Sequence, residues 1–257
     1  MANRLAVVTG ASSGIGLEIA RLASKEGYDL IVASDTPQVD PGAGLREAGV
    51  EVTAIEADLA TEGGVHQLLS KIDDRPVDVL VANAGHGLGH GFLQQSADEW
   101  RHVIDTNVTG TLLLIQPVAK AMVTRGEGRI LIVGSIAGEL PAAFQAVYHA
   151  SKAFIDSFAA ALGNELKDTG VTVTCLKPGP TETEFFSRAD MEDTKAGSSS
   201  KASAFDVAKA GWEGMKKGQE SVVPGLMNKA QVLVSGILPD SAKAELGRKQ
   251  NEPGSGQ

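Results

Sequence analysis

Short apolar runs rich in β-branched residues alternate with stretches of helical periodicity along most of this chain. The runs predict strands at Leu5–Val8, Leu30–Ala33, Val50–Ile55, Val77–Ala82, Arg129–Val133, Val171–Leu176 and Ser221–Val223. The stretches between them carry apolar residues at helical spacing, as in Gly14–Glu26, Gly64–Ile72, Asp98–Thr124 and Tyr148–Lys167. This alternation predicts an α/β fold with a doubly wound, mostly parallel seven-stranded sheet and helices on both faces.

The length of 257 residues suits one α/β domain, which we expect to span residues 1–250. Residues 180–203 follow the last long strand and are rich in Glu, Asp, Ser, Thr and Gly. This composition predicts a mobile substrate loop over a site, with a plain surface connector as the alternative. Residues 251–257 are polar and contain Gly and Pro, so we expect a disordered tail there.

Charge and cysteine content argue against several classes of protein. Acidic residues outnumber basic ones by 32 to 23, and no run of Lys or Arg could track phosphates, so nucleic acid is not an expected partner. The single cysteine, Cys175, excludes a disulfide framework and lies in an apolar run that predicts a buried thiol. No apolar run approaches the roughly 18 residues of a membrane span, and the N-terminus does not read as a signal peptide. We therefore expect a cytoplasmic protein.

A glycine-rich segment, Thr9–Gly16 (T-G-A-S-S-G-I-G), joins the first predicted strand to the first predicted helix. Its glycines permit a tight turn and let the backbone approach a pyrophosphate, while the helix N-terminus faces that anion. This context favours the dinucleotide site of a Rossmann fold over a simple turn. The residues expected to bind the cofactor here are Gly10, Ser12, Ser13, Gly14, Ile15 and Gly16.

Asp35 follows the second predicted strand, at a position where a carboxylate can accept hydrogen bonds from both ribose hydroxyls of the cofactor. The neighbouring positions Ser13, Thr36 and Pro37 carry no positive charge that could compensate a 2′-phosphate. We therefore expect NAD rather than NADP as the cofactor. The alternative is a turn-forming Asp before Pro37.

Two more polar segments follow predicted strands. Asp58 and Leu59 come after the third strand, and Asn83, Ala84 and Gly85 come after the fourth. Because the carboxyl ends of parallel strands meet at one edge of the sheet, we expect these five residues to contact the cofactor. Asp58 suits the adenine amino group, and Gly85 lets the cofactor approach the backbone. Taken singly, each is more typical of a turn.

In these segments and in four more, the chain resembles the short-chain dehydrogenase/reductase family over residues 4–190. The further motifs are D-T-N-V-T-G around Asn107, V-G-S-I-A-G around Ser135, Y-H-A-S-K from Tyr148 to Lys152, and P-G-P-T-E-T at 178–183. The resemblance implies a catalytic tetrad of Asn107, Ser135, Tyr148 and Lys152, in which Tyr148 and Lys152 also contact the cofactor. It also implies that Pro178, Gly179 and Thr183 hold the nicotinamide end.

The residue types of the tetrad suit acid–base chemistry. Tyr148 and Lys152 are four apart on a predicted helix, so their side chains share a face. We expect the Lys152 ammonium and the nicotinamide charge to lower the pKa of the Tyr148 phenol from its usual value near 10. Ser135 is expected to hold the substrate oxygen, with a strand-end cap as the alternative. Asn107 is expected to orient a water that links Lys152 to solvent, although an isolated Asn more often caps or lies on the surface.

The remaining candidates have weaker claims on the site. His86 and His90 flank a short loop without a thiol or carboxylate partner, so we expect no metal and assign them to the substrate wall. His149 points away from Tyr148 on the helix and is expected to be structural or exposed. Three phenylalanines, Phe144, Phe185 and Phe186, could either form apolar pocket surface or pack in the interior, and the sequence leaves both roles open.

The C-terminal part departs from the common family pattern, in which a V-D-G-G segment builds a tetramer interface. This chain instead reads V-V-P-G-L-M-N-K at 222–229, followed by an apolar stripe at 232–238 that could cover the pocket, form an interface or pack as a terminal helix. The predicted helices near 98–124 and 148–167 carry apolar residues on more than one side, and the resemblance implies that they pair across a dimer. We expect a homodimer or a homotetramer.

Together these features predict an oxidoreductase that transfers a hydride between NAD(H) and a secondary alcohol or the matching ketone or aldehyde. The segments that would shape the substrate, 86–95, 139–147 and 180–203, lack a charge cluster typical of phosphate or carboxylate binding, which favours a neutral, fairly apolar small molecule. The alternatives are a non-catalytic NAD(P)-binding regulatory module, an NADP-dependent carbonyl reductase, and an isomerase or lyase with a tightly held nicotinamide. The intact tetrad argues against the regulatory module.

Overall fold

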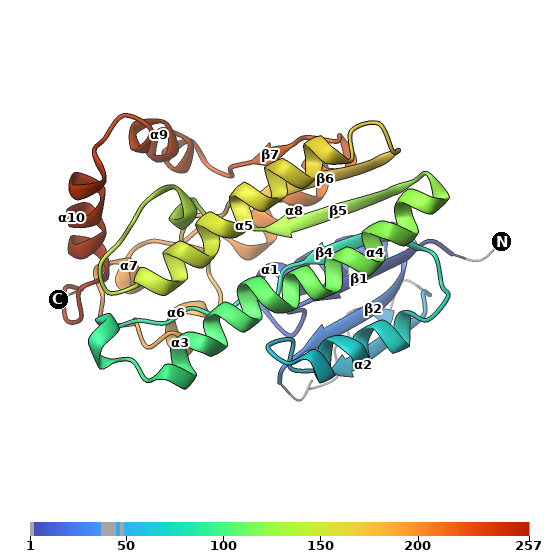
Figure 1. Cartoon of the computed structure of the whole chain (residues 1–257), viewed down its shortest axis with the longest axis horizontal. Coiled ribbons are helices and arrows are strands. Elements are labelled where there is room, and N and C mark those ends of the chain that lie inside the picture. The colour runs from blue at the N-terminus through green and yellow to red at the C-terminus, as the bar shows by residue number, and fades with distance from the viewer. Residues whose placement is uncertain (1–2, 37–44, 47–48, 257) are drawn as a thin grey trace.

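A computed structural model describes residues 3–36, 45–46 and 49–256 of the chain (Figure 1). Of the positions discussed above, Pro37 and the last residue of the expected tail, Gln257, lie outside the described residues, as do Met1 and Ala2 at the start of the expected domain.

Seven parallel strands form one sheet in the order β3-β2-β1-β4-β5-β6-β7. The strands are β1 (Leu5–Thr9), β2 (Asp29–Ser34), β3 (Val52–Glu56), β4 (Val77–Ala82), β5 (Gly128–Val133), β6 (Val171–Leu176) and β7 (Ser221–Val222). The strand order reverses between β1 and β4, which opens a crevice at the carboxyl ends of these two strands. The predicted α/β class is confirmed, and the sheet is wholly rather than mostly parallel.

Helices cover both faces of the sheet, as Figure 1 shows. One face carries α2 (Glu62–Ile72), α4 (Thr111–Arg125) and α5 (Ala146–Glu165), and the other carries α1 (Gly14–Lys25) and α8 (Ala204–Lys216). Each face therefore has its own hydrophobic core.

Every long strand contributes to both cores, because successive side chains point to opposite faces of a sheet. In β1, Val7 joins the core under α2, α4 and α5, whereas Val8 joins the core under α1 and α8. Both side chains are fully buried. Burial on both faces explains why the strand runs are continuously apolar instead of alternating.

The single helix expected over Asp98–Thr124 is three consecutive elements. The first, α3 (Ala97–Ile104), begins at a capping box between Ser96 and Glu99. A π-helix then spans Asp105–Gly110 before α4 begins. The wider turn contains the buried Asn107, and π-turns inside helices are frequent at functional sites.

Beyond β6 the chain forms shorter elements at the carboxyl edge of the sheet. The expected substrate loop contains α6 (Phe185–Arg188) and α7 (Lys195–Ser198), and three of its side chains, Phe186, Ala189 and Met191, form a small apolar cluster. After β7 come α9 (Leu226–Ser235) and α10 (Asp240–Asn251), drawn in red at the end opposite the N-terminus in Figure 1. Two short 3₁₀ turns, Phe92–Gln94 and Ile136–Glu139, complete this edge.

The C-terminal tail, for which composition predicts disorder, makes hydrogen bonds near the start of α7. Asn251 is buried at the end of α10, and the backbone N–H groups of Gly254 and Gly256 donate to Asp193, at 2.7 Å and 2.9 Å. The Ser255 hydroxyl accepts a hydrogen bond of 3.0 Å from the Lys195 N–H. These bonds join residues 254–256 to Asp193 and to Lys195, the first residue of α7, which polar composition alone does not reveal. Within the described part of the chain, no helix is long and apolar enough to cross a membrane.

Candidate active site

A cavity of about 560 Å³ lies at the carboxyl edge of the sheet, where the strand order reverses. Most of the expected site residues line it: Gly10, Ser12, Ser13, Gly14, Ile15, Asp35, Asp58, Leu59, Asn83, Ala84, Gly85, Ser135, Tyr148, Lys152, Pro178, Gly179 and Thr183. Gly16 and Asn107 are not part of its lining and lie behind its wall. The structure thus brings together residues from segments that span most of the chain.

The glycine loop forms one end of the cavity. Gly10 and Gly14 have positive φ angles of 62° and 57°, which favour glycine, and a Cβ at Gly10 would lie 2.7 Å from Nδ2 of Asn83. A Cβ at Gly16 would overlap the carbonyl oxygen of Gly10, so Gly16 supports the loop from behind. Ser13 begins α1 without a capping hydrogen bond from its side chain, which instead donates to the Glu184 carboxylate at 3.5 Å, and the first helical turn has no acidic residue. This open, positively polarised helix end fits the pyrophosphate of a dinucleotide.

The ends of β2 and β3 contribute two carboxylates to the same end of the cavity. Asp58 accepts a hydrogen bond of 2.9 Å from the backbone N–H of Ala60, so it has a turn role besides facing the cavity. Asp35 lies 2.5 Å from the guanidinium of Arg188 on α6. The expectation that no cation lies near Asp35 is therefore wrong, because the segment after β6 brings Arg188 across the cavity.

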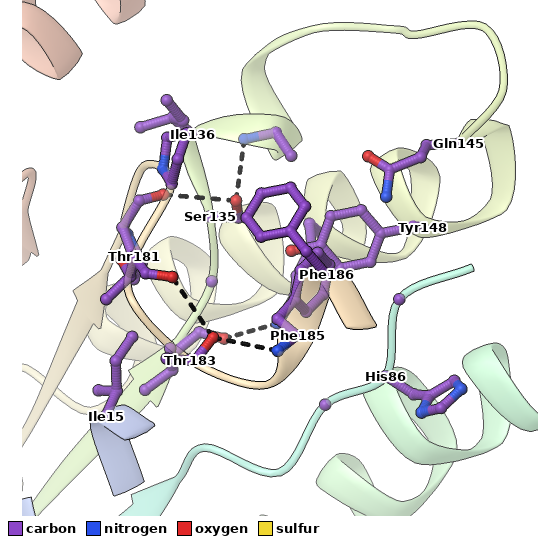
Figure 2. Close-up of a pocket in the computed structure, with 18 of the residues that line it drawn as sticks. Ile15, His86, Ser135, Ile136, Gln145, Tyr148, Thr181, Thr183, Phe185 and Phe186 are labelled. Carbon is purple, nitrogen blue, oxygen red and sulfur yellow. Dashed lines mark hydrogen bonds between the residues drawn. The ribbon is translucent and has the colours of Figure 1, made fainter. Parts of the chain in front are cut away.

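Ser135, Tyr148 and Lys152 meet at the other end. The Ser135 hydroxyl, at the end of β5, accepts from the Ala137 N–H at 3.1 Å and donates to the Pro178 carbonyl at 3.4 Å (Figure 2). It is also close enough to the Tyr148 phenol to lower the pKa of that group. The Lys152 ammonium lies 5.9 Å from the centre of the Tyr148 ring. It donates a hydrogen bond of 2.9 Å to the Val133 carbonyl. Tyr148 and Lys152 come from α5, and both are buried.

Asn107 supports this end from within the π-helix. Its side-chain oxygen accepts from the His86 N–H at 2.7 Å, and its amide nitrogen donates to the His86 carbonyl at 3.0 Å and to the Ser151 hydroxyl at 2.9 Å. These bonds fix the backbone beyond Gly85 against α5. The water-orienting role expected for Asn107 stays a prediction.

Burial controls the electrostatics of the catalytic end. Burial, opposed by the hydrogen bond with Ser135 and reinforced by the Asp156 carboxylate, raises the pKa of Tyr148 to about 12. Burial also lowers the pKa of the Lys152 ammonium, against the attraction of Asp156. The lowered Tyr148 pKa expected from the Lys152 charge is therefore not found in the protein alone, because the loss of solvation is the larger effect.

Several further residues line the catalytic end of the cavity. Phe185 packs on Tyr148 with ring centres 5.1 Å apart, and Gln145 donates to the Met191 sulfur at 2.6 Å (Figure 2). Motifs around Tyr148 gave no signal for Gln145, since its role depends on a contact with Met191 far along the chain. Apolar side chains from the C-terminal helices and the turn between them close another side: Val234 of α9, Leu238 of the turn and Leu246 of α10.

Some of the histidines line the cavity, and others lie around it, as does Phe144. His86 lines the cavity with His102, and their rings are 5.0 Å apart. His90 does not line it and instead pairs with Asp190 at 2.8 Å. His149 is buried, and its Nδ1 lies 2.6 Å from the Leu140 carbonyl, a structural contact beside Tyr148. Phe144 lies outside the lining, in contact with Arg248. Among the described residues, no three His, Cys, Asp or Glu side chains gather as metal ligands would.

Comparison with known proteins agrees with this geometry. The model of the short chain dehydrogenase family matches residues 4–194. A Streptomyces coelicolor protein with the provisional name ketoacyl reductase is 41% identical over 191 residues, which cover 70% of this chain and 72% of the relative. A short-chain dehydrogenase from Sphingobium yanoikuyae, solved with NADPH, superposes with a TM-score of 0.81 at 28% identity and covers 93% of this chain and 97% of its own. A Burkholderia phymatum relative solved with NAD gives a TM-score of 0.78 at 26% identity, with 90% and 92% covered.

Proposed function

The chain belongs to the short-chain dehydrogenase family of oxidoreductases, and we propose that it transfers a hydride between NAD(H) and a neutral, fairly apolar ketone or aldehyde or the matching secondary alcohol. One observation carries the proposal. Ser135, Tyr148 and Lys152 converge in the same cavity as the glycine loop, so an acid–base group and a dinucleotide site face one space. A regulatory module would need the dinucleotide site but not the acid–base group.

The protonation state of Tyr148 favours carbonyl reduction. With its pKa raised to about 12, the phenol is neutral and holds the proton that a carbonyl oxygen must gain. The Ser135 hydroxyl, beside the phenol, positions that oxygen, and Lys152 lies close enough to stabilise the phenolate left behind. The nicotinamide, when bound, supplies the hydride. In the reverse direction Tyr148 takes the proton back.

The glycine loop and the strand ends bind different parts of the cofactor. The N-terminus of α1 and the loop at Gly10 and Gly14 receive the pyrophosphate, and Asp35 accepts from the ribose hydroxyls of NAD(H). Pro178, Gly179 and Thr183 follow β6 and hold the nicotinamide end. All of these residues line the cavity.

The lining beyond Tyr148 indicates the substrate class. Phe185, Phe186, Leu140 and Leu246 give this end of the cavity an apolar wall, which suits a neutral substrate. Residues 180–203 supply part of that wall and are proposed to act as the substrate loop. A cytoplasmic location stays a prediction from the single Cys175, which is free and buried.

Replacing Tyr148 tests the proposal. Tyr148→Phe keeps the ring and its packing on Phe185 but removes the ionisable oxygen, so NADH binding should persist. Turnover of the best substrate from a panel of apolar ketones and alcohols should fall by about 10²–10⁴-fold, the usual contribution of a general acid–base group. Tyr28→Phe, in the core under α1 and α8, is the matched control and should keep its turnover. Turnover of Tyr148→Phe within about threefold of the wild type would remove Tyr148 from the mechanism.

A further inference from the structure

The loop that follows β6 brings a charged side chain to the cofactor end of the cavity. Arg188, the last residue of α6, places Nη2 of its guanidinium 2.5 Å from Oδ2 of Asp35. The two side chains line the same cavity, and each is 36% exposed. The ion pair therefore joins the proposed substrate loop to the end of β2, where the proposed function has the ribose bind.

Arg188 changes the charge that a cofactor meets at this strand end. A lone carboxylate accepts hydrogen bonds from ribose hydroxyls and repels the phosphate that NADP(H) carries on the same ribose. A guanidinium keeps its charge at all physiological pH values, so the Asp35–Arg188 pair is neutral overall. Guanidinium groups also bind phosphate through two parallel hydrogen bonds.

Arg188 is the one permanent cation at this end among the described residues that line the cavity. The other Lys or Arg side chain of that lining, Lys152, is bound to the Val133 carbonyl at the catalytic end. His86 is near enough to Arg188 and Asp35 to be influenced by both charges, but burial lowers its pKa and keeps it neutral at neutral pH.

The ion pair is also suited to exchange. Pairs between partly exposed side chains contribute little to stability, because solvent screens the charges and two side chains lose freedom. Opening the pair frees Asp35 for the ribose hydroxyls of NAD(H). When the 2′-phosphate of NADP(H) takes the place of the Asp35 carboxylate, Arg188 stays paired with an anion.

We propose that Arg188 is a cofactor-specificity residue that binds the 2′-phosphate of NADP(H), so that the chain binds NADP(H) as well as NAD(H). This inference rests on the proposed function and deepens it. Asp35 alone predicts a strong preference for NAD(H), whereas the Asp35–Arg188 pair reduces the difference in affinity between the two cofactors.

Binding of NADH and NADPH to the purified protein, measured by calorimetry without substrate, tests the proposal. The two dissociation constants of the wild type should lie within about tenfold of each other. Arg188→Met should weaken NADPH binding by about tenfold or more, the usual contribution of a charge-assisted hydrogen bond, and should change NADH binding by less than about threefold. AMP and adenosine 2′,5′-bisphosphate, which differ only in the 2′-phosphate, should show the same contrast.

Two variants serve as controls. Arg21→Met removes the same charge from the surface of α1, outside the cavity lining, and should leave both affinities unchanged. Asp35→Asn should weaken NADH binding and strengthen NADPH binding, because it removes the negative charge and one acceptor oxygen and frees Arg188 from its ion pair. NADPH binding more than about 100-fold weaker than NADH binding in the wild type, or equal losses for both cofactors in Arg188→Met, would overturn the proposal while leaving hydride transfer with NAD(H) intact. Failure of both cofactors to bind would overturn the proposed function and this inference with it.

Discussion

Tyr148 shows how much a single side chain depends on its surroundings. The Tyr–Lys spacing predicts a phenol made more acidic by a neighbouring ammonium, yet burial and the Asp156 carboxylate raise the Tyr148 pKa to about 12. Lys152 is itself buried and gives a hydrogen bond to Val133. In the protein alone Tyr148 is therefore protonated, and a further positive charge in the cavity should lower its pKa.

A pH titration of tyrosine absorbance checks this state. The chain has two tyrosines, so Tyr28→Phe leaves Tyr148 as the only phenol. We expect no tyrosinate until the pH approaches 12, and a lower apparent pKa after NAD⁺ is added, because the added charge stabilises the phenolate. The folded pKa lies above the unfolded value of about 10, so Tyr148 stabilises the fold below pH 10 and loses this contribution as the pH rises through its folded pKa. Ionisation of Tyr148 near neutral pH without cofactor would contradict this account.

The neighbours of Tyr148 should separate by their kinetic effects. Lys152→Met removes the amine near both Tyr148 and the nicotinamide end, so it should lower turnover and weaken NADH binding. Ser135→Ala should lower turnover by about tenfold or more with little effect on NADH binding, because in the proposed function the hydroxyl positions the substrate oxygen and does not bind the cofactor. Steady-state kinetics and NADH titration measure both effects, and Lys167→Met, exposed beyond α5, is the control for charge. Equal losses of NADH affinity in both variants would contradict the division of roles.

Residues whose roles follow from nearby motifs are the ones that sequence predicts well. The glycine loop and the Tyr148–Lys152 spacing are local, and the structure brings them to one cavity as expected. Arg188 and Gln145 were missed because their partners, Asp35 and Met191, are far away in the chain. A periodicity or a short motif carries no information about such contacts.

Among the elements, strands are predicted more accurately than helices and loops. The run Val171–Leu176 matches β6 residue for residue, because both of its faces are buried and the whole segment must be apolar. The stretch 98–124 keeps a helical pattern through the π-helix at Asp105–Gly110, since a single wider turn shifts the apolar face only slightly. Composition also gives no sign of the hydrogen bonds that Gly254 and Gly256 donate to Asp193.

Removing the tail tests whether it supports the cavity wall. Ala196 and Ser199 line the cavity, and the segment that contains them is bound by Gly254, Ser255 and Gly256. Deleting residues 252–257 should therefore speed amide hydrogen exchange across 194–199, measured by mass spectrometry, while α1 exchanges at its normal rate. Unchanged exchange across 194–199 would mean that α7 holds its position without the tail.

The C-terminal helices distinguish this chain from the common family pattern, in which a V-D-G-G segment follows the last strand. Val234 of α9 and Leu246 of α10 line the cavity, so the segment after β7 covers the site. Val234 and Leu238 of the apolar stripe thus cover the pocket, whereas Leu233 and Ile237 remain 77% and 83% exposed, so an interface at this segment stays a prediction. Sequence could not decide between these roles, because an apolar helix face does not identify what it packs against.

Exposed apolar side chains on α4 and α5 bear on the assembly of the protein. In the monomer, Leu113 of α4 and Phe154 of α5 remain 39% and 45% exposed, and Phe154 stacks on Phe158 at 6.4 Å, whereas Ile115 is buried in the core. Large apolar side chains exposed on two adjacent helices are typical of an interface, and we expect a homodimer through α4 and α5, alone or within a tetramer.

Light scattering at micromolar concentration measures this assembly. The wild type should have at least twice the monomer mass, and Leu113→Glu with Phe154→Glu should give a folded monomer, because burying unpaired carboxylates at an interface costs several kcal/mol. Leu93→Glu, at a side chain that is 90% exposed on the 3₁₀ turn Phe92–Gln94, is the control and should keep the wild-type mass. A monomeric wild type would show that the exposed faces of α4 and α5 do not form an interface between copies, and the catalytic assignment, which uses residues of one chain, would be unaffected.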